Sequence, residues 1–270
     1  MEIVDIIPFI PAGISAAPAG LVKVNYRSAE DRLADWTLAC PATRGTTWVV
    51  YLHGHGSGGD QLYTRQDVRT LWLPKFLDCG LGVLTPNLRG NAWMGPAAAA
   101  DLHALLQWVR TDYGAERFLL CGGSMGGTSV LIYAILHPED IAAAAACCPV
   151  TDLGEYLGWC RGQSAPVLGE IGAAIEHAYG GGPDVTPSVY HRHSVIAHSD
   201  RLAMPVFLVH GQADPIIPVD HAHRLTERMR GRTGFHYREI PDGDHDIPLR
   251  CEEVVAWICS PHDLPSVPPG

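Results

Sequence analysis

A serine between glycines is the first candidate for covalent chemistry in this chain. Residues 121–127 read Cys-Gly-Gly-Ser-Met-Gly-Gly, which places Ser124 in a Gly-x-Ser-x-Gly spacing. An apolar run predicts a strand before it and another predicts a helix after it, so the serine lies on a tight strand-to-helix turn. Such a turn strains the serine backbone and projects its hydroxyl from the sheet, while the glycines allow strand and helix to approach closely. Taken alone, the spacing also fits a glycine-rich turn with an incidental serine.

A serine hydroxyl is a weak nucleophile at neutral pH, and it needs a base that is itself oriented by an acid. Asp214 lies just beyond the penultimate predicted strand, and Pro215 biases it away from helical conformation. His245 lies just beyond the last predicted strand. The chain order Ser, Asp, His is the order of the catalytic triad in α/β hydrolases. We therefore expect Ser124, Asp214 and His245 to meet at one edge of the sheet as nucleophile, orienting acid and general base.

Other roles are open to residues of the same types. An aspartate after a strand can cap the next helix, as Asp220 or Asp246 could. His210, at a strand end, is expected to be hydrogen-bonded within the fold. Four further histidines are expected at the surface or in caps: His191, His193, His221 and His223. Their His-x-His spacings suggest zinc, but no set of carboxylates or cysteines completes a ligand shell, so we expect no metal.

The tetrahedral oxyanion of acyl transfer needs hydrogen-bond donors. The amide of Met125, at the start of the new helix, is one candidate. The second is expected in the loop after the strand that ends at Leu52, which reads His-Gly-His-Gly-Ser-Gly-Gly from residue 53. We assign it to the amide of His55, with Gly56 as the alternative. A phosphate-binding function for this loop is not favoured, because it lacks the Lys-Ser/Thr of a P-loop and the Gly-x-Gly-x-x-Gly spacing of a dinucleotide site.

Strands and helices are expected to alternate around these loops. Two leading strands, 21–26 and 35–40, are expected to form a hairpin. Further strands are predicted at 47–52, 81–85, 117–121, 141–148, 206–210 and 235–240. Helices are predicted at 60–77, 96–113, 125–136, 219–230 and 247–258. This alternation predicts an α/β fold: a mostly parallel sheet with helices on both faces.

One segment, residues 151–201, interrupts the alternation with Gly, Pro and aromatic residues and one helical stretch near 167–179. An insertion between two late strands would overhang the carboxyl ends of the strands, where open α/β sheets bind ligands. We therefore predict a cap or lid in which Tyr156, Trp159 and Tyr179 form an apolar wall for the substrate. The alternative is a structural excursion that buries its own aromatic residues.

Composition fits one enzyme-sized domain, residues 1–270, because 47% hydrophobic content is enough for a large core. With 19 basic against 29 acidic residues, the net charge of −10 disfavours nucleic acid and anionic membranes as partners. A small or uncharged substrate is favoured.

Localisation is predicted from the N-terminus, the hydropathy and the cysteines. Acidic residues and prolines in the first residues argue against an export signal, and no apolar run approaches the length of a membrane span. The eight cysteines include no Cys-x-x-Cys pair, which favours reduced thiols in the cytoplasm. The proline-rich end, 261–270, is expected to fray.

Taken together, these features resemble the α/β-hydrolase superfamily over nearly the whole chain. Within it, the chain is similar to the catalytic domain of the prolyl oligopeptidase family and its single-domain esterase relatives. The motifs that carry this resemblance lie at 86–90 (Pro-Asn-Leu-Arg-Gly), 122–127, 137–139 (His-Pro-Glu), 150–153 (Val-Thr-Asp-Leu) and 205–218. The chain departs from those peptidases in two ways: it has no room for a propeller domain, and its first loop lacks the proline that often follows the glycines.

The resemblance implies a cofactor-free serine hydrolase. Both departures favour a carboxylesterase that acts on small or aromatic acyl esters through an acyl-enzyme intermediate. A peptidase or amidase with the same triad is the first alternative. The second is a ligand-binding protein that has lost turnover, because a fold alone never excludes one. The sequence does not give the natural acyl and alcohol groups or the oligomeric state.

Overall fold

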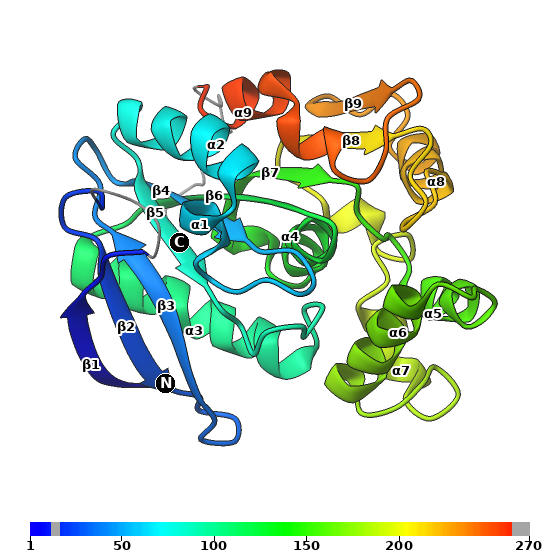
Figure 1. Cartoon of the computed structure of the whole chain (residues 1–270), viewed down its shortest axis with the longest axis horizontal. Coiled ribbons are helices and arrows are strands. Elements are labelled where there is room, and N and C mark those ends of the chain that lie inside the picture. Colours follow the sequence, from blue (N-terminus) through cyan, green and yellow to red (C-terminus); the bar gives the residue numbers. More distant parts are fainter. Residues whose placement is uncertain (12–16, 261–270) are drawn as a thin grey trace.

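The computed structural model describes residues 1–11 and 17–260, so the tail predicted to fray at 261–270 lies outside the described residues. Within them the chain forms a nine-stranded sheet in the order β1-β2-β3-β5-β4-β6-β7-β8-β9. Helices cover both faces of this sheet (Figure 1). The predicted α/β architecture is therefore confirmed.

Six strands form the parallel part of the sheet. They are β4 (Thr47–Leu52), β5 (Gly82–Pro86), β6 (Arg117–Gly123), β7 (Ile141–Cys147), β8 (Val206–Gly211) and β9 (Phe235–Ile240). In β4, Trp48 and Val50 pack on one face while Val49 and Tyr51 pack on the other. Because both faces are covered by helices, such strands read as continuous apolar runs, which made them predictable.

Three strands form the antiparallel part: β1 (Glu2–Pro8), β2 (Val22–Arg27) and β3 (Ala34–Cys40). The predicted hairpin is confirmed, because β2 and β3 pair antiparallel. The edge strand β1 was not predicted from the sequence. Most of its side chains are exposed on both faces, so it lacks the period-2 alternation that marks a half-buried strand.

The helices divide between the two faces. Residues of α2 (Gln66–Asp78) and α9 (Glu252–Ile258) pack on one face, and residues of α3 (Pro96–Tyr113), α4 (Met125–Leu136) and α8 (Asp220–Arg228) pack on the other. Two predicted helices are interrupted. The helix expected at 60–77 consists of α1 (Gln61–Thr64) and α2, broken where Arg65 is extended. The helix expected at 247–258 begins as a 3₁₀ turn, η3 (Ile247–Arg250), before α9.

The segment between β7 and β8 is more helical than the sequence indicated. It contains α5 (Leu153–Arg161), α6 (Pro166–Tyr179), α7 (Pro187–Arg192) and the 3₁₀ turn η2 (Ser199–Arg201), and Figure 1 shows α5–α7 grouped at one side of the sheet. The Asp152 carboxylate caps α5 by accepting a hydrogen bond of 3.0 Å from the amide of Glu155. Apolar residues of α5 and α6 join the same buried cluster as α3 and α4. A lid function for this segment stays a prediction.

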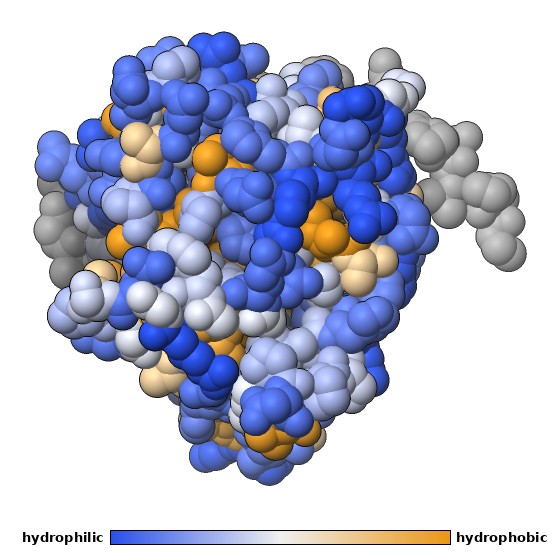
Figure 2. Space-filling model, turned by 90° about the vertical axis from the view of Figure 1, so that its right-hand side faces the viewer, coloured by the Kyte–Doolittle hydropathy of each residue, from blue (hydrophilic) through white to orange (hydrophobic). Residues whose placement is uncertain are grey.

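The surface of this side of the molecule is mixed. On the face of the described chain that Figure 2 shows, apolar residues occur in small groups separated by hydrophilic ones. No helix in the described part of the chain is long and apolar enough to cross a membrane.

Helix α4 approaches the sheet unusually closely at the turn that carries Ser124. A Cβ atom on Gly126 would lie 2.0 Å from the carbonyl oxygen of Leu52, and one on Gly127 would lie 2.5 Å from that of Cys147. These distances involve backbone atoms, which cannot rotate away as a side chain can. Glycine at both positions therefore allows the start of α4 to lie against β4 and β7.

We predict that Gly126→Ala lowers the free energy of unfolding by about 3 kcal/mol or more, because the added methyl group forces α4 away from β4. The matched control is Gly158→Ala in α5, where a Cβ atom would meet nothing within 4 Å. That change should be neutral or stabilise by up to about 1 kcal/mol. Urea denaturation of both variants measures the difference, and equal stability would contradict the close approach.

Candidate active site

The structure brings together the three side chains that the sequence proposes as a triad. Ser124 lies in the turn between β6 and α4, Asp214 lies in the loop after β8, and His245 lies in the loop between β9 and η3. The Nε2 atom of His245 is 2.9 Å from the Oγ atom of Ser124, and its Nδ1 atom is 2.7 Å from Oδ2 of Asp214. Two hydrogen bonds thus connect hydroxyl, imidazole and carboxylate in series.

The backbone of Ser124 is strained. Its φ of 59° and ψ of −123° lie outside the regions that non-glycine residues usually adopt. Such a conformation costs about 1–3 kcal/mol and persists only when its surroundings fix it. Here the amide of Ser124 donates to the carbonyl of Cys147 at 2.9 Å, and the carbonyl of Ser124 accepts from both the amide and the hydroxyl of Thr128, each at 2.9 Å.

The carboxylate of Asp214 is fully buried and is surrounded by donors. The amides of Ile216 and Ile217 donate to Oδ1 at 2.8 and 2.9 Å. On the Oδ2 side, Nε2 of His210 lies 3.4 Å away, in addition to His245. Burial raises the pKa of Asp214, but the hydrogen bonds from His210 and His245 outweigh burial and hold this pKa well below its usual range. Asp214 is therefore ionised at neutral pH.

The pKa of His245 is raised above its ordinary value of 6.5. Burial acts to lower this pKa, and the neighbouring Cys148 and Asp214 outweigh it through charge and hydrogen bonding. The Cys148 thiol donates to the carbonyl of His245 at 3.4 Å, and burial raises the pKa of this thiol, so it is uncharged at neutral pH. Asp214 therefore supplies the negative charge that stabilises the imidazolium form.

A cavity of about 170 Å³ opens beside Ser124 and His245. Its lining is mostly polar: Gly54, His55, Ser57, Gln61, Arg65, Gly123, Ser124, His245, Asp246 and Leu249. Arg65 pairs with Asp67 at 2.8 Å and with Asp246 at 2.9 Å, so its positive charge is already compensated. The cavity therefore suits a small polar or uncharged group better than an anion.

Sequence reasoning did not single out Gln61 and Arg65 as lining residues. Both lie in the segment that was predicted as one continuous helix, which would have placed them on its surface. The helix is interrupted at Arg65, and the short α1 lies beside the loop after β4, where Oε1 of Gln61 accepts from the amide of Gly54 at 3.0 Å. A polar glutamine among the apolar residues of a helix start is a weak signal that was available.

The two backbone amides predicted as oxyanion donors differ from their neighbours in their hydrogen bonds. Met125 is the first residue of α4, so its amide has no intrahelical acceptor. In the other loop, the amide of Gly54 donates to Gln61 and that of Gly56 donates to Asn91 at 2.8 Å. The amide of His55 between them has no acceptor among the residues that the structure describes. This pattern favours His55 over the alternative Gly56.

The aromatic residues proposed as a substrate wall lie elsewhere. Tyr156 and Tyr179 are buried, and none of the three aromatic residues is among those that line the cavity at Ser124. The Tyr156 hydroxyl donates to the carbonyl of Ile216 at 3.0 Å, and its ring stacks on the half-buried Trp159 with centroids 5.7 Å apart. Direct substrate contact by Tyr156, Trp159 or Tyr179 stays a prediction that this arrangement does not favour.

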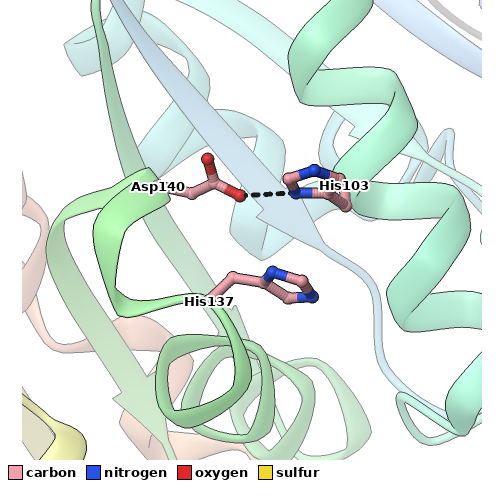
Figure 3. A group of neighbouring side chains, drawn as sticks. All are labelled: His103, His137 and Asp140. Carbon is pink, nitrogen blue, oxygen red and sulfur yellow. Dashed lines mark hydrogen bonds and ion pairs between the residues drawn. The ribbon is translucent and has the colours of Figure 1, made fainter.

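A second cluster of side chains of metal-ligand type, His103, His137 and Asp140, lies away from Ser124. Figure 3 shows His103 of α3 beside Asp140, with His137 below it. The Nδ1 atom of His103 is 2.8 Å from Oδ2 of Asp140, and the other carboxylate oxygen accepts from Arg110 at 2.7 Å. The His103 and His137 rings are stacked with centroids 4.7 Å apart, so their nitrogen lone pairs lie in nearly parallel planes and do not converge on one ion. Arg110 also neutralises Asp140. This cluster therefore does not fit a metal centre, and the expected absence of a cofactor stays a prediction.

Comparison with known proteins identifies the fold. A family described as alpha/beta hydrolase fold matches residues 47–161, from β4 to the end of α5. The substrate-bound structure of fluorophosphonate-binding serine hydrolase F from Staphylococcus aureus superposes with a TM-score of 0.69 at 13% identity, covering 91% of this chain and 100% of that chain. The chain therefore has the α/β-hydrolase fold.

The proteins that this chain resembles in sequence include an esterase and an acylamino-acid-releasing enzyme. Esterase LipQ of Mycobacterium tuberculosis is 26% identical over 57% of this chain and 39% of its own length. Acylamino-acid-releasing enzyme 2 of Oryza sativa subsp. japonica is 25% identical over 63% of this chain and 24% of its own length. The chain thus matches less than half of the length of either relative.

We predict that His245 titrates above 6.5 and that Asp214→Asn lowers its pKa by about 1–3 units, because the change removes the charge that stabilises the imidazolium. NMR titration of the His245 ring measures both values. The control is Asp244→Asn, which removes a carboxylate of the same loop that accepts only from the amides of Asp246 and Ile247. An unchanged pKa in Asp214→Asn, or an equal fall in Asp244→Asn, would contradict this electrostatic coupling.

Proposed function

We propose that the protein is a serine carboxylesterase that cleaves small or aromatic acyl esters. The observation that carries this proposal is the series of two hydrogen bonds from Ser124 through His245 to the buried Asp214, at 2.9 and 2.7 Å. Nucleophile, base and orienting acid in hydrogen-bond reach are the arrangement that activates a serine hydroxyl. The relatedness to esterases supports the same class.

In the proposed reaction the Oγ atom of Ser124 attacks the ester carbonyl carbon while Nε2 of His245 takes the hydroxyl proton. The amides of Met125 and His55 donate to the developing oxyanion. The carbon–oxygen bond of the ester then breaks, and His245 returns the proton to the departing alcohol. Water attacks the acyl-enzyme in the same way and releases the acid. Asp214 stabilises the imidazolium in both steps, and no cofactor takes part.

The neutral form of His245 is the base, so activity depends on its pKa. Because Asp214 raises this pKa above 6.5, kcat/KM should rise with pH through a value on the alkaline side of a free imidazole and fall as the ring is protonated below it.

The predicted cytoplasmic location and the absence of nucleic-acid and membrane partners remain proposals.

We expect Ser124→Ala to remain folded and to lose ester turnover by a factor on the order of 10⁵ to 10⁶, as when a triad nucleophile is removed. Kinetics with p-nitrophenyl esters measure the loss. A fluorophosphonate should label wild-type protein at Ser124 and should not label the variant. Wild-type turnover by Ser124→Ala, or an adduct found at another residue by mass spectrometry, would refute the assignment.

A peptidase or amidase is the second candidate, because one relative is named as an acylamino-acid-releasing enzyme. The compact, polar cavity of about 170 Å³ favours the esterase, since it leaves little room for an extended peptide. A ligand-binding protein without turnover is less favoured, because all three triad positions are filled and hydrogen-bonded.

We expect p-nitrophenyl esters of short or aromatic acids to turn over much faster than the matching p-nitroanilides. The ester has the better leaving group, and the cavity of about 170 Å³ beside Ser124 leaves little room for an extended peptide. Measurement of kcat/KM for both series, corrected for their rates of alkaline hydrolysis, gives the comparison. Corrected anilide rates equal to the ester rates would favour the peptidase.

A further inference from the structure

The His55 side chain has a defined protonation state. The Nε1–H group of Trp93 donates to Nδ1 of His55 at 3.2 Å. An indole nitrogen can only donate, so Nδ1 must present a lone pair, and the neutral ring carries its proton on Nε2. Burial lowers the pKa of His55 and outweighs the exposed carboxylate of Glu170, which raises it. The ring is therefore neutral near pH 7 and is a hydrogen-bond donor at Nε2.

Trp93 is held rigidly in the position that fixes His55. Trp93 and Met94 have φ values of 46° and 53°, which bulky side chains rarely adopt. The hydroxyl of Tyr179 donates to the carbonyl of Trp93 at 3.0 Å, and the Tyr156 ring lies 5.9 Å from the indole. Residues of α5 and α6 thus maintain a strained backbone whose indole orients the imidazole of His55.

His55 is one of the residues that line the cavity beside Ser124. Other polar side chains of this wall are already engaged: Gln61 donates to Ser57 at 2.8 Å, and Arg65 pairs with Asp67 and Asp246. Within the described residues, Nε2 of His55 has no hydrogen-bond partner. The lining of the cavity therefore includes a residue whose neutral ring has a donor that is not committed to another group among the described residues.

We propose that the Nε2–H group of His55 binds a second acceptor oxygen of the substrate, so that the preferred substrates are small esters with an ether, hydroxyl or carbonyl oxygen near the ester group. This inference rests on the proposed ester hydrolysis at Ser124. It is separate from the oxyanion role of the His55 amide, because it concerns the side chain. The proposal also gives Tyr156 and Tyr179 an indirect role in specificity, because they hold Trp93 in the position that orients His55.

Paired esters that differ by one oxygen test the proposal. p-Nitrophenyl methoxyacetate and p-nitrophenyl butyrate have the same chain length, as do the butyrate esters of 2-methoxyethanol and butanol. The ratio of kcat/KM within each pair is measured for wild type and variants, and dividing the wild-type ratio by the variant ratio cancels intrinsic reactivity. His55→Phe should lower the preference for the oxygen-containing ester in at least one pair by about 3- to 10-fold, the worth of one neutral hydrogen bond.

Trp93→Phe should lower the same preference by a smaller factor, because the ring of His55 remains but is free to carry its proton on Nδ1. The control is Trp108→Phe, which removes an indole hydrogen bond of 2.7 Å to Asp112 on α3, and it should keep the wild-type ratio. Unchanged ratios in His55→Phe for both pairs would overturn the proposal, and so would an equal loss in Trp93→Phe and Trp108→Phe.

A measurement that does not depend on turnover tests the inferred protonation of His55 on Nε2. ¹⁵N NMR of the wild-type histidine rings distinguishes protonated from unprotonated nitrogens, and His55 should show its proton on Nε2. A proton on Nδ1 would overturn the proposal. Because this measurement uses wild-type protein, it remains decisive even if the His55→Phe variant folds poorly. If wild type neither cleaves esters nor reacts with a fluorophosphonate, the proposed function fails. If the wild type cleaves esters but the kcat/KM ratios within the ester pairs are the same in wild type and variants, only this inference fails.

Discussion

The buried carboxylate of Asp214 constrains the architecture of the site. An ionised carboxylate away from water is tolerated only when its oxygens are fully hydrogen-bonded. The loop after β8 meets this need by turning two amides toward Oδ1, while His210 and His245 approach Oδ2. The hydrogen bond to Asp214 fixes the position of the His245 ring, and the position of this ring determines how Nε2 approaches the Ser124 hydroxyl. The geometry at the serine thus follows from the solvation of a charge on the far side of the imidazole.

A second constraint acts on the backbone. Ser124 is strained, and so are Trp93 and Met94 in the loop before α3. These two segments are held by hydrogen bonds from different elements: β7 and α4 hold Ser124, and α6 holds Trp93. Strained residues of this kind cluster at active sites, ligand clamps and switch regions. The strained Trp93 links helix α6 to the cavity, because Tyr179 of α6 binds its carbonyl and its indole binds His55. The aromatic rings of the inserted helices do not themselves line the cavity.

Sequence reasoning predicted the parts of this molecule that depend on local chemistry. The glycines around Ser124, and aspartate and histidine after successive strands, indicated which side chains meet. Apolar runs such as β4 indicated the buried strands. It did not find β1, whose exposed faces carry no alternation, or the break at Arg65, which depends on contacts distant in sequence. The link from Tyr179 to Trp93 to His55 joins three separate segments, and no single segment contains a pattern that predicts it.

Charge compensation explains why a chain with a net charge of −10 has a nearly neutral reaction cavity. Arg65 is balanced by Asp67 and Asp246, and Asp214 is shielded from the cavity by His245. An anionic substrate would gain little from a paired guanidinium and would be repelled by the overall charge. A long alkyl chain would gain little from polar walls, because it buries apolar surface only against apolar surface. The proposed substrate, a small uncharged ester, is compatible with both limits, because its oxygens would accept hydrogen bonds from groups that are already oriented and lose little entropy on binding.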